Sequence, residues 1–140
     1  MAAKRPIGGK KYFTVTEANA VLPLARAIVR DITELARNLR EHYGRLSDDK
    51  GRLGEAHQEE LQQAVERDQE QLREYVEELQ KLGIELKDYH SGLIDFPSLM
   101  DGREVYLCWK LGEPEVAHWH ELEAGFAGRQ KIMADAASGA

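Results

Sequence analysis

The stretch ANAVLPLARAIVRDITELARNLREHYGRL, residues 18–46, decides the fold of this chain. Its side chains repeat an apolar pattern at steps of three and four, the spacing that places residues on one face of an α-helix. This first row consists of Ala18, Val21, Ala25, Ile28, Ile32, Leu35, Leu39, His42 and Leu46. A second row, at steps of seven, consists of Leu22, Val29, Ala36 and Tyr43. The stretch therefore predicts one helix of roughly eight turns with two faces to bury.

The residues around this stretch mark where the helix begins and ends. Thr14 and Glu17 have the spacing of a capping box, in which each side chain accepts a backbone N–H at the start of a helix. Pro23 removes one backbone hydrogen bond, so we expect the helix to bend there. Residues 47–51, with the sequence SDDKG, are typical of a turn.

Another apolar row indicates a second helix. It consists of Leu61, Val65, Asp68, Leu72, Tyr75, Leu79 and Leu82. Gly83 follows where a helix C-cap is expected. Two helices joined by a short polar loop predict an antiparallel hairpin over residues 12–83, with arms about 40 Å long. Folding the chain at the predicted turn puts His42 opposite residues 57–60, so His42 and Asp68 are not expected to pair.

After the second helix the pattern changes to the two-residue alternation of β-strands. Alternating runs are found at residues 84–87, 93–96, 103–111 and 116–120. Pro97 is expected to end the second run. The last run is favoured as a strand, with a helix from Pro114 to Gly125 as the alternative. The predicted fold class is α+β: a long antiparallel helical hairpin followed by a small three- or four-stranded antiparallel sheet over residues 84–132.

The length of 140 residues suits one domain, which we expect over residues 12–132. The segments 1–11 and 133–140 contain little apolar surface and are expected to be flexible tails. One partner helix cannot cover both rows of the first helix. Either the sheet or a second copy of the chain must cover the remainder, and a symmetric homodimer would do so.

The charge balance is acidic, with 25 acidic and 19 basic residues and a net charge of −6. This balance argues against nucleic acid as a partner, because phosphate contacts need clustered lysine and arginine. No run approaches the roughly 20 apolar residues that span a bilayer, so no membrane partner is expected. The single cysteine, Cys108, cannot form an internal disulfide. With no signal-peptide pattern at the N-terminus, it predicts a cytoplasmic protein.

The segment HWHELE, residues 118–123, is the best candidate for a metal site. On a strand, His118 and His120 point to the same side, and two imidazoles with Glu121 or Glu123 suit a divalent transition metal such as zinc. The histidine spacing resembles the opening of the cupin metal motif, but the carboxylate falls early and four strands cannot form a cupin barrel. The alternative is that both histidines are hydrogen-bonded polar residues at a sheet edge.

Four other residues of the β-rich segment are candidates for ligand binding. Asp95 or Cys108, or else His90 outside these four, could supply a further metal ligand, and Arg103 with Arg129 could form an anion pocket for a small molecule of unknown identity. The alternative for both arginines is ion pairing with nearby carboxylates. A nucleophilic Cys108 would need a neighbouring base and an exposed thiolate, whereas a buried cysteine usually acts as a small hydrophobic residue.

Several motifs resemble those of one bacterial family. They are YFTV (12–15), LPL (22–24), LGIELKD (82–88), GLIDFP (92–97), GREVYLCW (102–109), GE (112–113), WHE (119–121) and GFAGR (125–129). Over about residues 12–132 the chain resembles the bacterial family known as domain of unknown function 2203. The resemblance implies a bacterial, cytoplasmic protein and supplies no activity. It includes His120 but not His118, which implies a shared site of His120 with Asp95, Cys108 and Arg129.

Two hypotheses about function follow from these patterns. The long helix with two apolar rows favours an interaction or assembly module that associates with itself through the helical hairpin. The alternative is a metal-binding protein, or a metal-dependent enzyme, with its site around His120. The sequence does not decide whether the protein is an enzyme.

Overall fold

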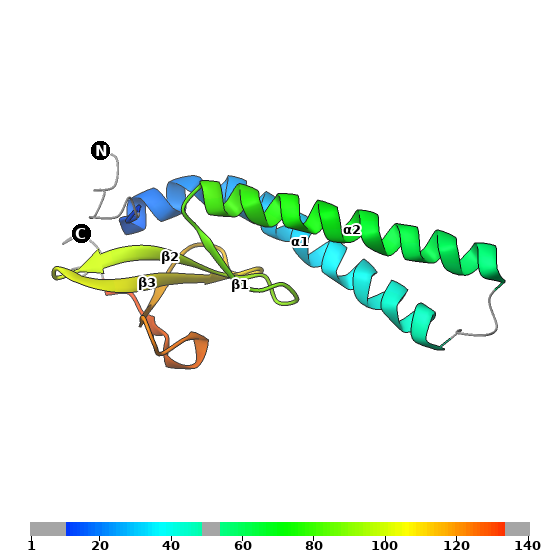
Figure 1. Cartoon of the computed structure of the whole chain (residues 1–140). Helices are drawn as coiled ribbons and strands as arrows, with labels where there is room; N and C mark the ends of the chain where they lie inside the picture. Colours follow the sequence, from blue (N-terminus) through cyan, green and yellow to red (C-terminus); the bar gives the residue numbers. More distant parts are fainter. Residues whose placement is uncertain (1–10, 49–53, 134–140) are drawn as a thin grey trace.

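The computed structural model describes residues 11–48 and 54–133. Two helices come first, α1 (Val15–Asp48) and α2 (Glu55–Lys81). The elements that follow are β1 (Glu85–Asp88), β2 (Leu93–Met100), β3 (Arg103–Lys110), β4 (His118–Glu121), the short 3-10 helix η1 (Phe126–Gly128) and β5 (Gln130–Lys131). The strands form one antiparallel sheet in sequence order (Figure 1). The predicted α+β class is confirmed, with five strands instead of three or four.

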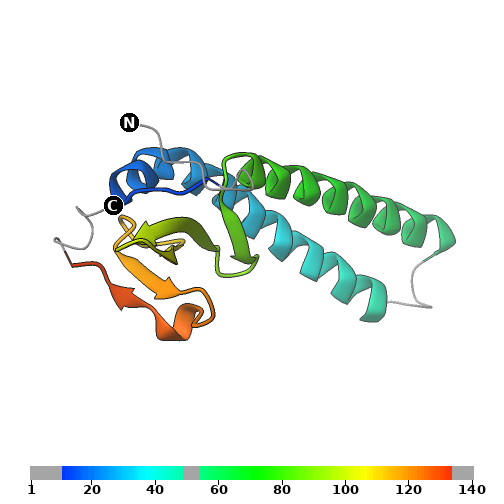
Figure 2. The same cartoon turned by 60° about the vertical axis from the view of Figure 1, so that its left-hand side comes forward.

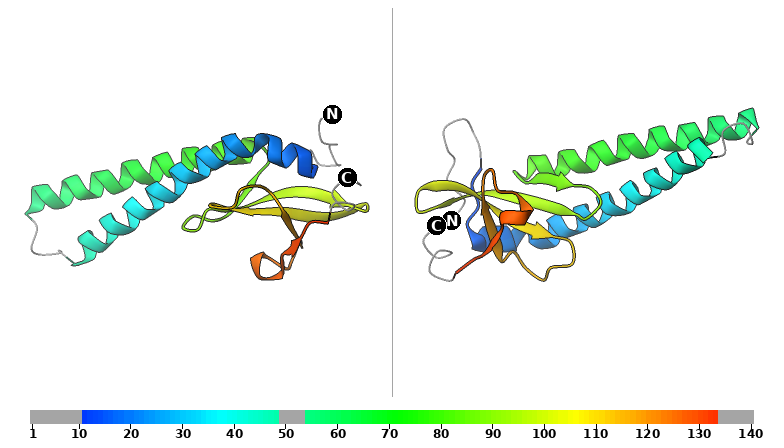
Figure 3. Two further views of the ribbon diagram at one scale, coloured as in Figure 1. Left: turned by 180° about the vertical axis from the view of Figure 1, so that it is seen from behind. Right: turned by 90° about the horizontal axis from the view of Figure 1, so that it is seen from below.

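The start of α1 forms as its sequence predicts. Thr14 N–H donates to Glu17 Oε1 at 2.9 Å, and Glu17 N–H donates to Thr14 Oγ1 at 3.1 Å, which is a complete capping box. Pro23 lies inside the helix. The blue N-terminal stretch of α1 runs at an angle to the rest of the helix (Figure 3), as expected for a proline in the first third of a long helix.

The two helices lie side by side as an antiparallel hairpin (Figure 1), but their alignment differs from the prediction. His42 Nδ1 lies 3.3 Å from Asp68 Oδ2, so the expectation that these residues do not pair is wrong. Because His42 and Asp68 are equally far in sequence from residue 55, the chain reversal is centred near that residue. The prediction centred the reversal on residues 47–51. Residues 49–51 of that predicted turn lie outside the described part of the chain.

The sheet packs against the hairpin and covers the second apolar row of α1 (Figure 2). Leu22 and Val29 from that row are buried in one core with Ile94, Phe96 and the side chains of β3. The approach is close at the β1–β2 turn, because an added Cβ at Gly92 would lie 2.8 Å from Val29 Cγ1. For Leu22 and Val29, the covering for which a second copy was considered is therefore supplied within the chain. Tyr43, the last member of the row, is 47% exposed.

Strand β2 continues through Pro97 to Met100, so the prediction that the proline ends the strand is wrong. The carbonyl of Pro97 accepts the N–H of Phe13 at 2.7 Å. In an antiparallel ladder the N–H and C=O of one residue point to the same side. The missing N–H of Pro97 would therefore point away from β3, and no bond between β2 and β3 is lost.

The favoured strand interpretation of residues 116–120 is confirmed by β4, and the helix alternative is wrong. The fifth strand, β5, has only two residues and pairs with His118 and Trp119. A strand this short has no alternation for the sequence to reveal. The tails predicted at residues 1–11 and 133–140 stay predictions, because all but Lys11 and Met133 lie outside the described part of the chain.

Candidate metal centre

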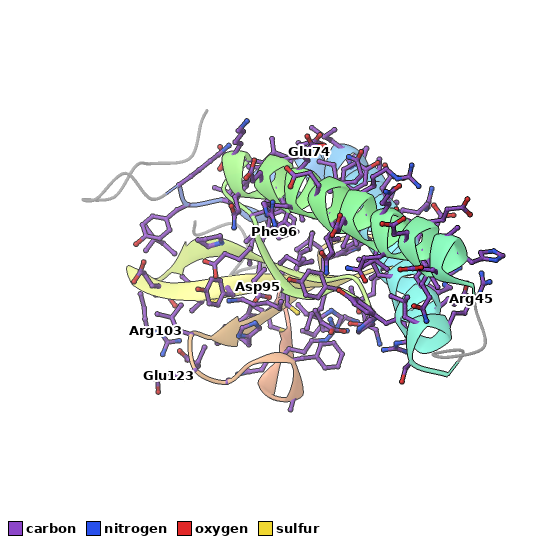
Figure 4. The ribbon with its side chains drawn as sticks, turned by 45° about the vertical axis from the view of Figure 1, so that its right-hand side comes forward. Arg45, Glu74, Asp95, Phe96, Arg103 and Glu123 are labelled. Atoms are coloured by element: carbon purple, nitrogen blue, oxygen red, sulfur yellow. The ribbon has the colours of Figure 1, made fainter. Side chains whose placement is uncertain are left out.

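The candidate site lies on the face of the sheet that points away from the helices. Side chains alternate along each strand, and Phe96 and Leu107 pack into the core shared with the helices. Asp95 on β2, Cys108 on β3 and His120 on β4 therefore point to the opposite face. All three are fully buried, with 2%, 0% and 2% of their surface exposed. Figure 4 shows Phe96 between the sheet and α2, with Asp95 further from that helix.

The pairing of the strands brings these three residues together. Asp95 is the direct partner of Cys108 across β2 and β3. His120 is the partner of Tyr106 across β3 and β4, two residues along from Cys108. The ring of Tyr106 lies 5.5 Å from that of His120 and helps to enclose it. The His120 side chain reaches diagonally across β3 towards Asp95.

Both imidazole nitrogens of His120 are engaged. Nδ1 lies 2.7 Å from the carbonyl oxygen of Glu121, which can only accept, so Nδ1 carries a proton. Nε2 lies 3.0 Å from Asp95 Oδ2, and this second contact needs one further proton, on the nitrogen or on the oxygen. No ring nitrogen is left to deprotonate Cys108, so the three residues do not form a nucleophile–base–acid triad.

One polar atom of these three residues lacks a hydrogen bond within the described part of the chain, and burial raises the pKa of both acidic groups. Asp95 Oδ1 is buried and has no hydrogen-bond partner among the residues that the structure describes. Burial raises the pKa of Asp95, and the neighbouring His120 opposes this rise. Burial, followed by the charge of Asp95, raises the pKa of the Cys108 thiol to about 11, although Arg129 acts in the opposite direction. Cys108 is therefore a thiol at neutral pH rather than a reactive thiolate.

Together these residues form what we call the donor cluster: one nitrogen, one oxygen and one sulfur atom from Asp95, Cys108 and His120, all within 4.8 Å of one another. Ligand atoms of a tetrahedral zinc ion lie about 3.3–3.6 Å apart, given zinc–ligand bonds of about 2.0–2.3 Å. The widest pair would thus have to close by about 1.5 Å at most, which small side-chain rotations can supply. The hydrogen bond from Nδ1 to a backbone carbonyl is the usual outer support of a metal-bound histidine.

A charged pair covers the donor cluster at Cys108. Arg129 Nη1 lies 3.8 Å from Cys108 Sγ and 3.1 Å from Glu113 Oε1, and Arg129 Nη2 contacts Glu113 Oε2. Lys110 N–H donates to Glu113 Oε1 at 2.8 Å. Burial acts to raise the pKa of Glu113, but the hydrogen bonds from Arg129 and from Lys110 N–H outweigh it and leave the pKa lowered. We call the Arg129–Glu113 pair the clamp.

The other residues predicted as metal ligands, His118, Glu121 and Glu123, do not belong to the donor cluster. His118 faces the same side of the sheet, opposite Cys108, and its Nδ1 is 3.9 Å from Glu113 Oε2. Glu121 contributes its backbone carbonyl, while its carboxylate pairs with Arg103 at 2.9 Å. Glu123 is exposed. In Figure 4 Arg103 and Glu123 lie at the edge of the β-rich part, away from Asp95.

The two arginines predicted to form an anion pocket do not converge. Arg103 alternates in phase with Val105 and lies over the ring of Trp119, whereas Arg129 contacts Cys108 on the opposite face of the sheet. Each has its own carboxylate partner, as the ion-pair alternative stated. Sequence reasoning named Glu113 only in the GE motif of the family resemblance and in the turn Gly112-Glu113-Pro114, and it gave the side chain no role.

These features define an α+β protein with a helical hairpin, a five-stranded antiparallel sheet and a buried cluster of nitrogen, oxygen and sulfur donors. The chain belongs to the family described as uncharacterized conserved protein DUF2203, whose profile matches residues 11–132. Neither the curated proteins nor the solved structures gave a match. Among the described residues, no helix combines the length and apolarity needed to cross a membrane.

Proposed function

We propose that this protein binds a divalent transition metal, with zinc as the best fit, through Asp95, Cys108 and His120. One observation supports the proposal above the others: three different buried donor atoms from three neighbouring strands lie within 4.8 Å of one another. Borderline metals such as zinc accept this combination of carboxylate, thiolate and imidazole. Mg²⁺ and Ca²⁺ prefer oxygen ligands only, so the sulfur donor argues against them.

The electrostatics of the site favour a bound cation. A buried polar atom without a partner costs about 1–3 kcal/mol, and Asp95 Oδ1 is such an atom. A dication would satisfy it and would replace the proton between His120 and Asp95 together with the proton of the Cys108 thiol. Two positive charges enter as two protons leave, so the buried group stays neutral overall.

Three protein ligands leave a fourth position of a tetrahedral zinc ion to be filled. His118 is one candidate, because it is the strand partner of Cys108 and its Nδ1 is buried without a hydrogen-bond partner among the described residues. A water molecule is the other candidate, and it would give the three-ligand arrangement found in catalytic zinc sites. Comparing the metal spectra of the wild type and His118→Ala distinguishes the two.

Metal analysis and cobalt substitution test the proposal. The purified protein should contain about one zinc per chain, and Co²⁺ should give the near-ultraviolet sulfur-to-metal absorption and intense visible bands of a tetrahedral site. Cys108→Ser should lose the sulfur band, and His120→Ala should lower the affinity at least tenfold. His90→Ala, an exposed histidine in the β1–β2 turn, is the matched control and should change nothing. Metal well below one equivalent, with no cobalt spectrum, would leave the proposal without support.

Self-association through the hairpin is a second proposal, supported by a separate observation. An apolar groove of about 340 Å³ runs between the helices and the β1–β2 turn. It is lined by Ala36, Leu39, Arg40, Tyr43, Leu72, Tyr89 and His90. Helix α2 has nine acidic and three basic residues, so α2 of a second copy would meet Arg40 with complementary charge.

Sedimentation at micromolar concentration tests this second proposal. Tyr89 is 46% exposed at the groove, and Tyr89→Glu should shift a dimer to monomer by placing a charge on the apolar surface. Leu24→Glu is the matched control, since Leu24 is 52% exposed at the other end of α1 and should leave the dimer intact. A wild-type protein that is strictly monomeric contradicts self-association.

A further inference from the structure

The clamp places a guanidinium group directly over the donor cluster. Arg129 Nη1 is 3.8 Å from Cys108 Sγ, and the Arg129 side chain is only 16% exposed. Its other face lies against the ring of Phe126 at 4.4 Å. The sulfur donor of the cluster is therefore covered by a positive charge that is held in place from two sides.

Two separate turns hold the clamp in position. Glu113 belongs to the β3–β4 connection and is fixed by the N–H of Lys110, while the Trp109 indole N–H donates to the Glu113 carbonyl at 3.0 Å. Arg129 follows η1, and its own N–H donates to the carbonyl of Phe126 at 3.1 Å. Because Arg129 lies in the β4–β5 connection and not in a strand, its side chain can turn outward without breaking the sheet.

The charges of the clamp act in opposite directions on a cation that approaches Cys108. A dication bound to Sγ would lie within a few ångströms of the guanidinium, where repulsion in a site shielded from water is strong. The Glu113 carboxylate, paired with the same guanidinium, carries the opposite charge and offsets this repulsion. Loading of the donor cluster therefore depends on where Arg129 sits and on whether Glu113 stays paired with it.

We propose that Arg129 and Glu113 form an electrostatic gate that controls how fast and how tightly a transition metal enters the donor cluster. With the clamp closed, the guanidinium excludes cations from Cys108. With Arg129 turned outward, the cluster is open and the Glu113 carboxylate attracts the metal. This inference rests on the proposed metal-binding function and assigns its regulation to two residues that are not ligands.

Substitutions of the two clamp residues should change metal binding in opposite directions. Arg129→Gln should raise the association rate of Co²⁺ and tighten its binding at least tenfold, because the repelling charge is gone. Glu113→Gln should weaken binding at least tenfold, because Arg129 then acts without its neutralising partner. Arg129→Lys keeps the charge and should behave like the wild type. Arg103→Gln, which removes an exposed ion pair at the end of the sheet, is the control and should stay within twofold.

Stopped-flow mixing with Co²⁺ and chelator competition measure these changes, and thermal unfolding of each metal-free variant verifies its fold. A purely structural clamp would make both Arg129→Gln and Glu113→Gln less stable and weaker in binding, and this result overturns the gate while leaving metal binding intact. If Arg129→Gln binds the metal and the wild type does not, the gate is supported, because removing the guanidinium alone opens the donor cluster. Absence of binding in the wild type and in every variant overturns the metal-binding function and the gate with it.

Discussion

Zinc binding to the metal-free protein should release two protons per metal ion. The contact of 3.0 Å between His120 Nε2 and Asp95 Oδ2 holds one proton, because Nδ1 already donates to the Glu121 carbonyl. The Cys108 thiol holds the second proton, since its pKa is raised to about 11. Both must leave before carboxylate, thiolate and imidazole can bind the metal.

The consequence is a steep dependence of zinc affinity on pH. Each released proton contributes a factor of ten per pH unit, so the affinity should rise about 100-fold per unit wherever the metal-free cluster holds both protons. Calorimetric titration in buffers of different ionisation enthalpy counts the released protons directly. In Cys108→Ser the count should fall to one and the affinity should rise only about tenfold per unit. A wild-type count of zero would refute the reasoning, since it would mean that zinc does not displace the protons of the cluster.

Three further changes test the rest of the structure by unfolding measurements. Gly92→Ala should lower the free energy of unfolding by about 2–4 kcal/mol, because a Cβ there meets neighbouring atoms at 2.8 Å and φ is +71°. Gly112→Ala should lower it by only about 1–2 kcal/mol, because a Cβ there meets open space and only the φ of +107° is unfavourable. A His42→Ala and Asp68→Ala double-mutant cycle should give a coupling below about 1 kcal/mol, because the pair is partly exposed; a coupling above about 2 kcal/mol contradicts this. The pKa of the Cys108 thiol is raised from 9.0 to about 11, so folding favours the protonated form. The free energy of unfolding of the metal-free protein should therefore fall by up to about 3 kcal/mol between pH 9 and pH 11. Cys108→Ala should not show this fall.

The helical hairpin could be predicted from the sequence because helix periodicity is a local property. The first row of α1 repeats for most of the helix, and the capping box at Thr14 and Glu17 lies within four residues of chain. The pairing of His42 with Asp68 could not be predicted in the same way. It depends on where the chain reverses between the helices, and one turn sequence leaves that position free to shift by several residues.

The sheet shows the same difference between local and long-range information. Alternation predicted the strands around Asp95 and Cys108, but it gave no indication that β2 passes through Pro97. Whether a proline is tolerated depends on which side of the strand its missing N–H would point to. That side is set by the segment at Phe13, which lies far away in the sequence.

The candidate site could be predicted only as a set of residues. Asp95, Cys108, His120 and Arg129 were all singled out, partly through the family resemblance, but their distances depend on the pairing of three strands. Residues two apart on a strand share a face, so spacing alone did not separate His118 from His120, and only the family resemblance favoured His120. The sequence assigned no role to Glu113, because its contact with Arg129 joins two connections that are 16 residues apart in the chain.

X-ray absorption at the zinc edge of the zinc-loaded protein is the most direct test of the site. The account predicts one sulfur ligand at about 2.3 Å and two or three nitrogen or oxygen ligands at about 2.0–2.1 Å, with the sulfur contribution lost in Cys108→Ser. A zinc ion surrounded only by nitrogen and oxygen, with the same spectrum in the wild type and in Cys108→Ser, would show that the metal binds elsewhere and would contradict the proposed centre.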